Sequence, residues 1–365
     1  MKEKIVSILF VSTLLVFGLG SIIAKDNDIS YKERRTLTKM PSLNLKSIFS
    51  GSDNYFENLT NYFNDQFIFR DNFKSLKGIT TSKIFVMKEN NGIYEKDNYL
   101  FQMDTNVNKK SIDNLLNKIK YIDNTYLDNQ NKYFVMIPDK NYYLDDENIP
   151  KIGYNTIIDS LKNGLPNDVK WIDITKSLTL DSYYRTDIHF KENKLSDVVK
   201  TLSNNMNFES SNTNYTLKKY YPFYGALYGK VASNIKADEI EYLTNDVINN
   251  ASVYNYEKNR VEKVYMEDYL KNVDSYDVFL SGATPLLIIE NEFNDSGKEL
   301  VMFRDSFASS LTPLLIESYS KIVMVDLRYV SSKYLEKINE FSVKEDADVM
   351  FIYSTVIINN SFSLK

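Results

Sequence analysis

Residues 299–310 of this 365-residue chain read ELVMFRDSFASS, and residues 311–316 continue as LTPLLI. The apolar run before Arg304 predicts a buried strand, the Asp-Ser pair predicts a tight turn, and the small residues after it predict the start of a helix. This order would expose the Ser306 hydroxyl at the carboxyl end of a strand, beside backbone N–H groups that can stabilise an oxyanion. The simpler interpretation is that Asp305 or Ser306 only caps the helix.

Similar apolar runs recur along the chain and predict further strands. They lie at 133–137, 169–174, 286–289, 300–303, 322–325 and 349–353. Helical patterns lie between them, at 110–126, 196–206 and 309–318. Buried strands that alternate with helices predict an α/β fold, in which helices cover both faces of a mostly parallel sheet. A polar stretch around 207–272 interrupts this alternation and predicts an excursion from the sheet.

The chain contains one histidine, His189, which follows Asp187 by two positions in the segment YRTDIHF at 184–190. Any acid–base chemistry by imidazole must therefore use His189. Serine, histidine and aspartate together form a metal-free nucleophilic centre, in which imidazole takes the serine proton and the carboxylate fixes the ring. A lone histidine is also common as a surface or core residue, and this alternative stays open.

Composition excludes several classes of function. The formal net charge of −5 and the isoelectric point of about 5.3 leave no basic footprint for nucleic acid. The chain has no cysteine, which removes disulfides, cysteine-ligated metals and thiol nucleophiles. A single histidine also argues against a zinc site. We expect no metal and no cofactor.

The N-terminus predicts a membrane anchor. Lys2 and Lys4 precede an apolar run at 5–24, and about 20 apolar residues suffice to cross a bilayer as a helix. The end of this run, GSIIA, is a poor cleavage site, which favours an uncleaved signal anchor over a cleaved, secreted form. The positive flank should stay in the cytoplasm, so that the residues after Lys25 lie outside the cell.

We expect three parts in the chain. Residues 1–25 form the anchor. Residues 26–80 form a stalk and an amphipathic helix around 55–73. Residues 81–365 form the catalytic domain and include the excursion around 207–272.

Several motifs lie in the order in which one known family carries them. The chain has ERRTL at 33–37, YFNDQFIFRD at 62–71, GIY at 92–94, DNYLF at 97–101 and IPDK at 137–140. It then has YRTDIHF at 184–190, RDSF at 304–307 and IVMVDLRY at 322–329. These segments resemble the DHHW-motif proteins, which are related to the periplasmic alginate O-acetylation enzymes. The resemblance implies an SGNH-hydrolase-like three-layer sandwich with a central, mostly parallel sheet.

The resemblance also implies roles for individual residues. It assigns Ser306, His189 and Asp187 to a catalytic triad. The expected oxyanion donors are the backbone N–H groups of Ser306 and of Gly282, although a glycine in the segment FLSGATP at 279–285 could equally form an ordinary turn. The residues expected to contact substrate are Tyr184, Arg185, Lys140, Arg304 and Tyr224, the last in the segment YYPFYG at 220–225.

The chain departs from the family pattern at several positions. Ile188 and Phe190 replace the second and fourth residues of the DHHW motif, which changes the packing around the imidazole. Ala283 stands where the family has an amide side chain, and loss of one oxyanion donor costs about 10²–10³ in rate. Residues 191–194, KENK, replace the family's usual Thr and Gly, so contacts to the acceptor should differ.

The resemblance implies an extracytoplasmic O-acetyltransferase that modifies a cell-surface polysaccharide or exopolysaccharide, and the Ser, His and Asp residues predict that it acts through an acyl-serine intermediate. A carbohydrate acetylesterase would differ only in using water as the acceptor. A non-catalytic, polysaccharide-binding component of an envelope export assembly is a further alternative. It is favoured by Ile188, Phe190 and Ala283 and disfavoured by the intact triad residues.

Two further observations bear on partners. The chain has 28 tyrosines, whose rings can stack on sugars, although heavy use of Asn, Lys and Ile beside them also fits a bias in composition. Acetyl-CoA is cytoplasmic, so a domain outside the cell needs its acyl group handed across the membrane. The resemblance implies a membrane-bound O-acyltransferase as that partner.

Overall fold

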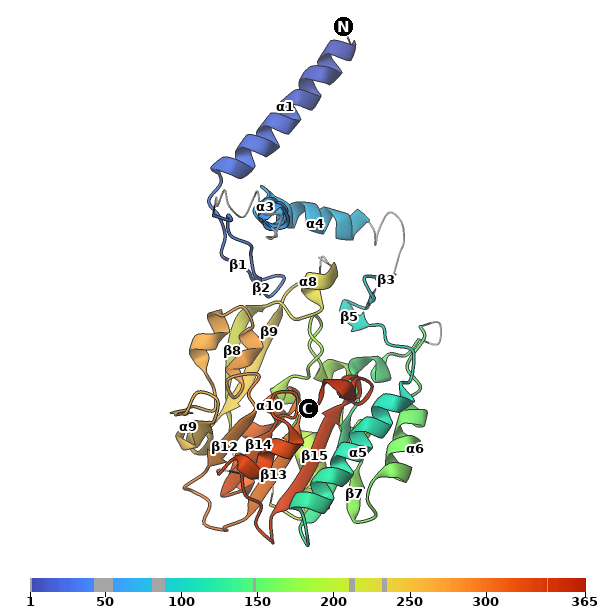
Figure 1. The fold of residues 1–365 in the computed structure, drawn as a ribbon, viewed down its shortest axis with the longest axis vertical. Coiled ribbons are helices and arrows are strands. Elements are labelled where there is room, and N and C mark those ends of the chain that lie inside the picture. Colours follow the sequence, from blue (N-terminus) through green and yellow to red (C-terminus); the bar gives the residue numbers. More distant parts are fainter. Residues whose placement is uncertain are drawn as a thin grey trace.

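The computed structural model describes residues 2–42, 55–80, 89–146, 149–209, 214–231, 235–339 and 341–365. A large body holds the residues from 89 onward, and the N-terminal helices lie above it (Figure 1).

An eight-stranded sheet forms the centre of the body, in the order β11-β10-β12-β14-β13-β15-β6-β7. Its strands are β6 (Asn131–Ile137), β7 (Val169–Ile172), β10 (Ser252–Asn255), β11 (Arg260–Glu262), β12 (Leu286–Glu290), β13 (Glu299–Arg304), β14 (Lys321–Val325) and β15 (Asp348–Ser354). The strands from β14 to β7 pair in parallel, whereas β12, β10 and β11 pair antiparallel at the other edge. The prediction of a mostly parallel central sheet is confirmed.

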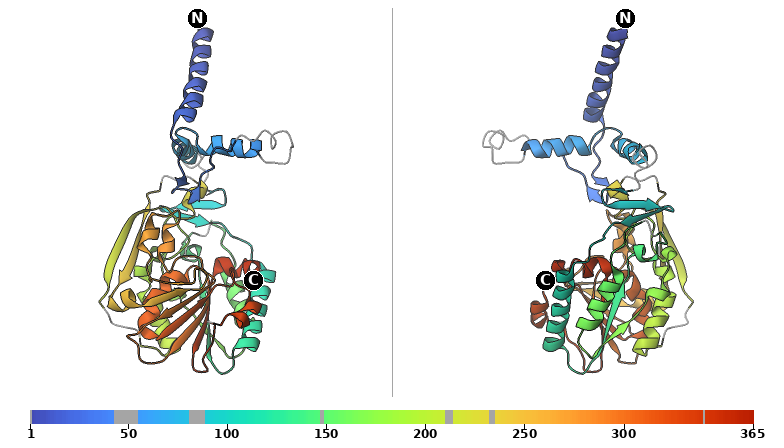
Figure 2. Two further views of the ribbon diagram at one scale, coloured as in Figure 1. Left: turned by 60° about the vertical axis from the view of Figure 1, so that its left-hand side comes forward. Right: turned by 90° about the vertical axis from the view of Figure 1, so that its right-hand side faces the viewer.

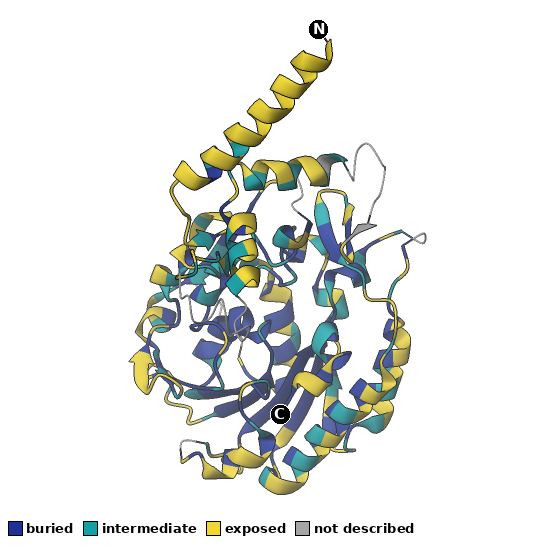
Figure 3. Cartoon of the chain, turned by 45° about the horizontal axis from the view of Figure 1, so that its top comes forward, coloured by how far each residue is buried: buried dark blue, intermediate teal, exposed yellow. Residues whose placement is uncertain are grey.

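Helices cover both faces of this sheet, so the predicted three-layer α/β architecture is confirmed. Helices α5 (Lys109–Tyr126) and α6 (Tyr154–Gly164) lie side by side on one face (Figure 2). Helix α7 (Ser196–Met206) packs into the core on the other face, together with α10 (Ala308–Leu311) and the 3-10 segment Thr312–Ser318. Strand β13 is buried along its whole length, as expected for a strand covered on both sides. Figure 3 shows this contrast between the buried sheet and the exposed outer faces of the helices.

The six predicted strands correspond to β6, β7 and β12 to β15, and two of the predicted helices to α5 and α7. The predicted helix at 309–318 is mostly 3-10. The predicted excursion around 207–272 leaves the sheet only in part. It holds the ribbon of β8 (Thr216–Phe223) and β9 (Asp238–Thr244) with α8 (Tyr228–Val231) and α9 (Asp246–Asn250), and then β10 and β11 return to the sheet edge.

The N-terminal part begins with α1 (Lys2–Ile23), which is the one helix among the described residues long and apolar enough to cross a membrane. A hairpin of β1 (Ile29–Ser30) and β2 (Arg35–Thr36) follows, then α3 (Tyr55–Asp65) and α4 (Arg70–Ile79). The sequence predicted a single helix around 55–73, but the chain bends between α3 and α4, where Phe69 adopts a positive φ of 60°.

A small sheet of β3 (Glu89–Asn90), β4 (Ile93–Lys96) and β5 (Tyr99–Gln102) lies at the top of the body (Figure 1).

Candidate active site

The turn after β13 presents Ser306, and its neighbour Asp305 fixes the turn. The Asp305 carboxylate accepts the N–H of Phe307 at 3.0 Å and the N–H of Ser354 at 2.7 Å. Ser354 ends the adjacent strand β15, so this carboxylate ties the turn to the sheet. The N-cap of α10 (Ala308–Leu311) is Phe307, which has no side-chain cap hydrogen bond, so neither Asp305 nor Ser306 caps this helix and the Ser306 hydroxyl is free for another partner.

A second loop carries His189. Tyr183 and Phe190 form an isolated antiparallel bridge, and the Tyr184 N–H donates to the His189 carbonyl at 3.1 Å. These contacts close a narrow hairpin with Asp187 near its tip. The Asp238 carboxylate, from β9, holds the other side by accepting the Thr186 N–H at 2.7 Å and the Thr186 hydroxyl at 2.5 Å.

The two loops meet in a hydrogen-bonded relay. His189 Nε2 lies 2.8 Å from Ser306 Oγ, although the two residues are 117 positions apart. His189 Nδ1 lies 2.5 Å from Asp187 Oδ1. Asp187 is fully buried, His189 is 6% exposed and Ser306 is partly exposed. The hydrogen bonds therefore link a buried carboxylate, through the imidazole, to a hydroxyl that solvent can reach. This is the arrangement that activates a serine nucleophile.

The Asp187 carboxylate has a donor on each side. Oδ1 accepts the backbone N–H of His189 at 3.0 Å as well as the Nδ1 contact. Oδ2 accepts the Ala226 N–H at 2.7 Å and Arg34 Nη1 at 2.8 Å. Burial alone would raise the pKa of Asp187, but His189 and Arg34 outweigh it and hold this pKa well below its ordinary value. Asp187 is therefore ionised, as an orienting carboxylate must be.

Comparison with solved structures identifies proteins of similar fold. A DHHW family protein from Eubacterium siraeum matches with a TM-score of 0.61 and 17% identity, over 75% of this chain and 94% of that one. PatB1 from Bacillus cereus, in a structure with a sulfonyl adduct, matches with a TM-score of 0.57 and 18% identity, over 73% of this chain and 95% of that one. A second PatB1 structure gives a TM-score of 0.55, 18% identity and coverage of 73% and 96%.

This chain has the DHHW-family fold. The sequence itself matches no family model and no curated protein. The predicted likeness to DHHW proteins therefore stands on the shared architecture.

The oxyanion donors differ from the prediction at one of two positions. The Ser306 N–H has no acceptor among the described residues, so it is available to a ligand. The Gly282 N–H instead donates to the Phe279 carbonyl at 3.1 Å within a tight turn, so the prediction of Gly282 as a donor was wrong. Gly282 has a positive φ of 74°, and Leu280 and Ser281 before it also have positive φ values of 53° and 63°. Such strained turns concentrate at functional sites.

Three of the predicted substrate contacts are core residues instead. Lys140, Tyr184 and Arg304 are 2%, 0% and 0% exposed, so their side chains cannot reach a dissolved substrate. Lys140 Nζ donates to the carbonyls of Tyr184, Arg185 and Asp187 at 2.9, 3.0 and 2.8 Å and so braces the loop from inside. Arg304 pairs with Asp326 at 3.4 Å beneath the nucleophile turn.

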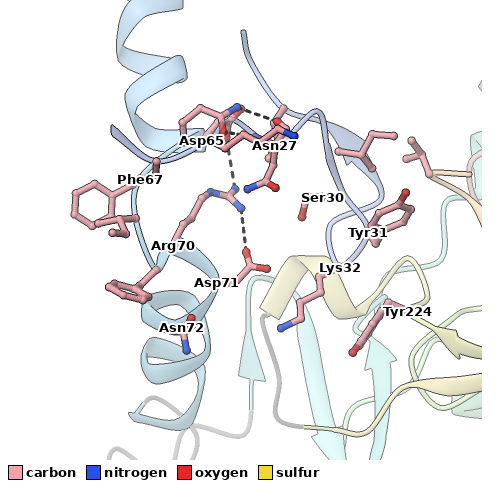
Figure 4. Close-up of a pocket in the computed structure, with 18 of the residues that line it drawn as sticks. Asn27, Ser30, Tyr31, Lys32, Asp65, Phe67, Arg70, Asp71, Asn72 and Tyr224 are labelled. Atoms are coloured by element: carbon pink, nitrogen blue, oxygen red, sulfur yellow. Dashed lines mark hydrogen bonds and ion pairs between the residues drawn. The ribbon is translucent and has the colours of Figure 1, made fainter. Parts of the chain in front are cut away.

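The other two predicted contacts lie nearer the surface. The Arg185 side chain is 32% exposed but pairs with Asp238 at 3.3 Å, on the far side of the loop. Tyr224 lines a groove of about 750 Å³ between the body and the N-terminal part, opposite Arg70 and Phe67 (Figure 4). The triad residues do not line this groove.

The prediction missed four residues that support the triad: Arg34, Gly225, Asp238 and Tyr276. Gly225 allows a close approach of the two loops, because an added Cβ would overlap the backbone and Cβ of Asp187. The imidazole of His189 is flanked by Tyr276 and by Phe307, whose ring centroid lies 4.7 Å away. Arg34 and Gly225 each lie in a segment that the sequence already singled out, ERRTL and YYPFYG, whereas Asp238 and Tyr276 had no such signal.

Proposed function

We propose that this protein is an extracytoplasmic serine O-acetyltransferase that modifies a cell-surface polysaccharide or exopolysaccharide. The observation that carries the proposal is the contact of Ser306 with His189, backed by the buried, ionised Asp187. The shared DHHW-family fold and the motifs that resemble alginate O-acetylation proteins support the choice of reaction.

In this proposal Ser306 Oγ attacks the carbonyl carbon of an acetyl donor while His189 Nε2 takes the hydroxyl proton. The Ser306 N–H stabilises the oxyanion, and the leaving group departs with the proton from His189. A sugar hydroxyl then attacks the acetyl-serine and gives its proton to His189. Collapse of the second intermediate returns that proton to Ser306 Oγ and releases the acetylated sugar.

The same proposal covers topology and partners. Helix α1 would anchor the chain, with Lys2 and Lys4 in the cytoplasm and the body outside. A membrane-bound O-acyltransferase would then supply the acyl group, since acetyl-CoA stays inside the cell. Tethering keeps the active site near that donor without a tight interface, because it raises the effective concentration.

The first experiment tests for the nucleophile. The full chain in detergent should release p-nitrophenol from p-nitrophenyl acetate, and mass spectrometry should find the acetyl group on the peptide with Ser306. Ser306→Ala should lack both signals, whereas Ser296→Ala, at an exposed loop serine, should keep them. A sulfonyl fluoride is a second probe, since the PatB1 structure is described with a sulfonyl adduct. Equal turnover by the wild type and Ser306→Ala would refute the proposal.

The second experiment separates transferase from acetylesterase. Soluble oligosaccharides are added to the same assay, and acetylated sugar is measured against free acetate. A transferase forms the acetylated sugar, whereas an esterase forms acetate alone. Absence of turnover and of an adduct would instead favour the non-catalytic component.

A third experiment tests topology. Protease added outside intact cells should digest the body, and cross-linking from residues 26–42 should capture a polytopic membrane protein. Protection of the body until the membrane is lysed would contradict the proposed orientation.

A further inference from the structure

The candidate active site receives a charged side chain from outside the body. Arg34 lies in the turn between β1 and β2, and its Nη1 contacts Asp187 Oδ2 at 2.8 Å across 153 positions of sequence. The side chain of Arg34 is 12% exposed and that of Asp187 is 0% exposed. An ion pair shielded from water in this way interacts more strongly than a surface pair.

We propose that Arg34 is a positioning residue of the active site, which holds the Asp187 carboxylate in the orientation that His189 requires. This inference rests on the proposed function. Both N–H contacts of His189 are to Oδ1, so Oδ2 is left for Ala226 and Arg34. Donors on both oxygens stop the carboxylate from rotating. Without Arg34, Oδ2 keeps one backbone donor, and a buried carboxylate loses a cation that compensates its charge.

The guanidinium is itself oriented by the body. Its second terminal nitrogen pairs with Asp274, so Arg34 bridges Asp274 and Asp187. Arg34 has a positive φ of 52°, a conformation that is uncommon for a residue with a side chain. A fork with two nitrogens can serve two carboxylates at once, which a lysine ammonium cannot do in the same geometry.

The preceding residue connects this contact to helix α4. Glu33 accepts Arg70 Nη2 at 2.7 Å and also pairs with Lys74, and both partners lie on α4. Gly229 of α8 packs against Glu33 from the other side, where an added Cβ would overlap the Glu33 backbone. Figure 4 shows Arg70 reaching from α4 toward Asp65, beside the hairpin. The hairpin is therefore clamped between α4 and the body, and its docking delivers Arg34 to the triad.

The neighbouring residue Arg35 provides a matched control. It makes a comparable set of ion pairs, to Glu33 at 2.8 Å and to Asp65 at 2.5 Å, and none to the triad. The test compares Arg34→Ala, Arg34→Lys and Arg35→Ala with the wild type in the full chain, by kcat and KM on p-nitrophenyl acetate and by thermal unfolding. Ser306→Ala serves as the inactive reference.

We expect Arg34→Ala to lower kcat by about 10²-fold with little change in KM, since misalignment of a catalytic group costs about that much. Arg34→Lys should recover part of the loss, and added guanidinium should restore the activity of Arg34→Ala but not that of Ser306→Ala. Arg35→Ala should keep its kcat even if its unfolding temperature falls.

Two results would overturn the inference: a kcat of Arg34→Ala within threefold of the wild type, or an equal loss of kcat in Arg35→Ala, which would make the effect one of general loosening. Wild-type turnover that does not depend on Ser306 would instead remove the proposed function itself, so the two failures are distinguishable.

Discussion

Tyr276 lies flat against the imidazole of His189, with ring centroids 4.0 Å apart and an angle of 12° between the ring planes. The Tyr276 hydroxyl is 2.9 Å from Ser310 Oγ, in α10 and four residues after Ser306. Burial raises the pKa of Tyr276 well above its ordinary value, so the stacked ring is a neutral phenol. The histidine is thus held through its face as well as through its two nitrogens.

This stacking gives the first prediction. Tyr276→Phe keeps the ring and should retain kcat within about threefold, since it loses only the neutral contacts of the hydroxyl with Ser310 Oγ and the Ser306 carbonyl. Tyr276→Ala removes the surface against which the imidazole rests, and kcat on an activated ester should fall by about 10²-fold. Steady-state kinetics on both variants test this. Equal kcat in the two variants would show that the ring has no orienting role.

The second prediction concerns Gly225. In Gly225→Ala the new Cβ would overlap Asp187, so the loop must shift and kcat should fall by about 10²-fold. Gly297→Ala is the control, because Gly297 has a positive φ of 70° and no atom within 4 Å of an added Cβ. That control should cost about 1 kcal/mol of stability and leave kcat unchanged. Normal kcat in Gly225→Ala would mean that the loop absorbs a methyl group without moving the triad.

The third prediction concerns Lys140. Its ammonium form has three N–H groups for the three carbonyls of the histidine loop, and burial lowers the pKa of Lys140 to about 7 against the attraction of Asp187. Lys140→Met would leave these carbonyls without their donor and should lower the unfolding free energy by about 3 kcal/mol. Urea unfolding measures this, with the exposed Lys110→Met as the reference. An unchanged midpoint would contradict the bracing role.

The fourth prediction is about pH and starts from Glu192, which is fully buried. Burial raises its pKa from the ordinary 4.5 to about 8, against the opposing contacts of Leu243 and Tyr265. The Tyr265 hydroxyl lies 2.8 Å from Glu192 Oε1 and 2.7 Å from the Leu243 carbonyl. A hydroxyl has one hydrogen, and the carbonyl can only accept, so a proton on Glu192 satisfies both contacts.

The folded state therefore holds a proton between pH 4.5 and about 8 that the unfolded state has released. Stability from this group is present below pH 4.5 and is lost as the pH rises toward 8, by at most about 1.4 kcal/mol per pH unit. Glu192→Gln keeps the shape and both hydrogen bonds without a titrating proton. Urea midpoints at pH 5, 6.5 and 8 should therefore fall less steeply for Glu192→Gln than for the wild type, and parallel curves would exclude a neutral Glu192.

The sheet and the nucleophile turn could be predicted because their signals are local. An apolar run such as 300–303 by itself predicts a buried strand, and the Asp-Ser pair of the turn follows it directly in the chain. The short strands β10 and β11 gave no such signal. The residues of β10 alternate between half-buried and buried, and two of the three residues of β11 are exposed, so the place of these strands depends on the pairing of β10 with β12 and of β11 with β10.

The support around the triad could not be predicted, because it is built from contacts over long separations. Arg34 reaches Asp187 across 153 positions, and Asp238 reaches Thr186 across 52. Lys140 and Arg304 were expected to contact substrate from the family resemblance, which does not reveal that both side chains are buried. The charge of Lys140 is compensated by backbone carbonyls and that of Arg304 by the Asp326 carboxylate, and only the fold shows those partners.

The solitary histidine also makes the protein unusually easy to observe. His189 is the only imidazole in 365 residues, so selective ¹⁵N labelling of histidine gives signals from the active site and from nothing else. The hydrogen between Nδ1 and Asp187, across 2.5 Å, should resonate far downfield of the amide region, where no assignment is needed to recognise it. The proposed acyl transfer, ligand binding and tautomer exchange at His189 can therefore be followed by magnetic resonance in an otherwise silent window, without mutating a single residue.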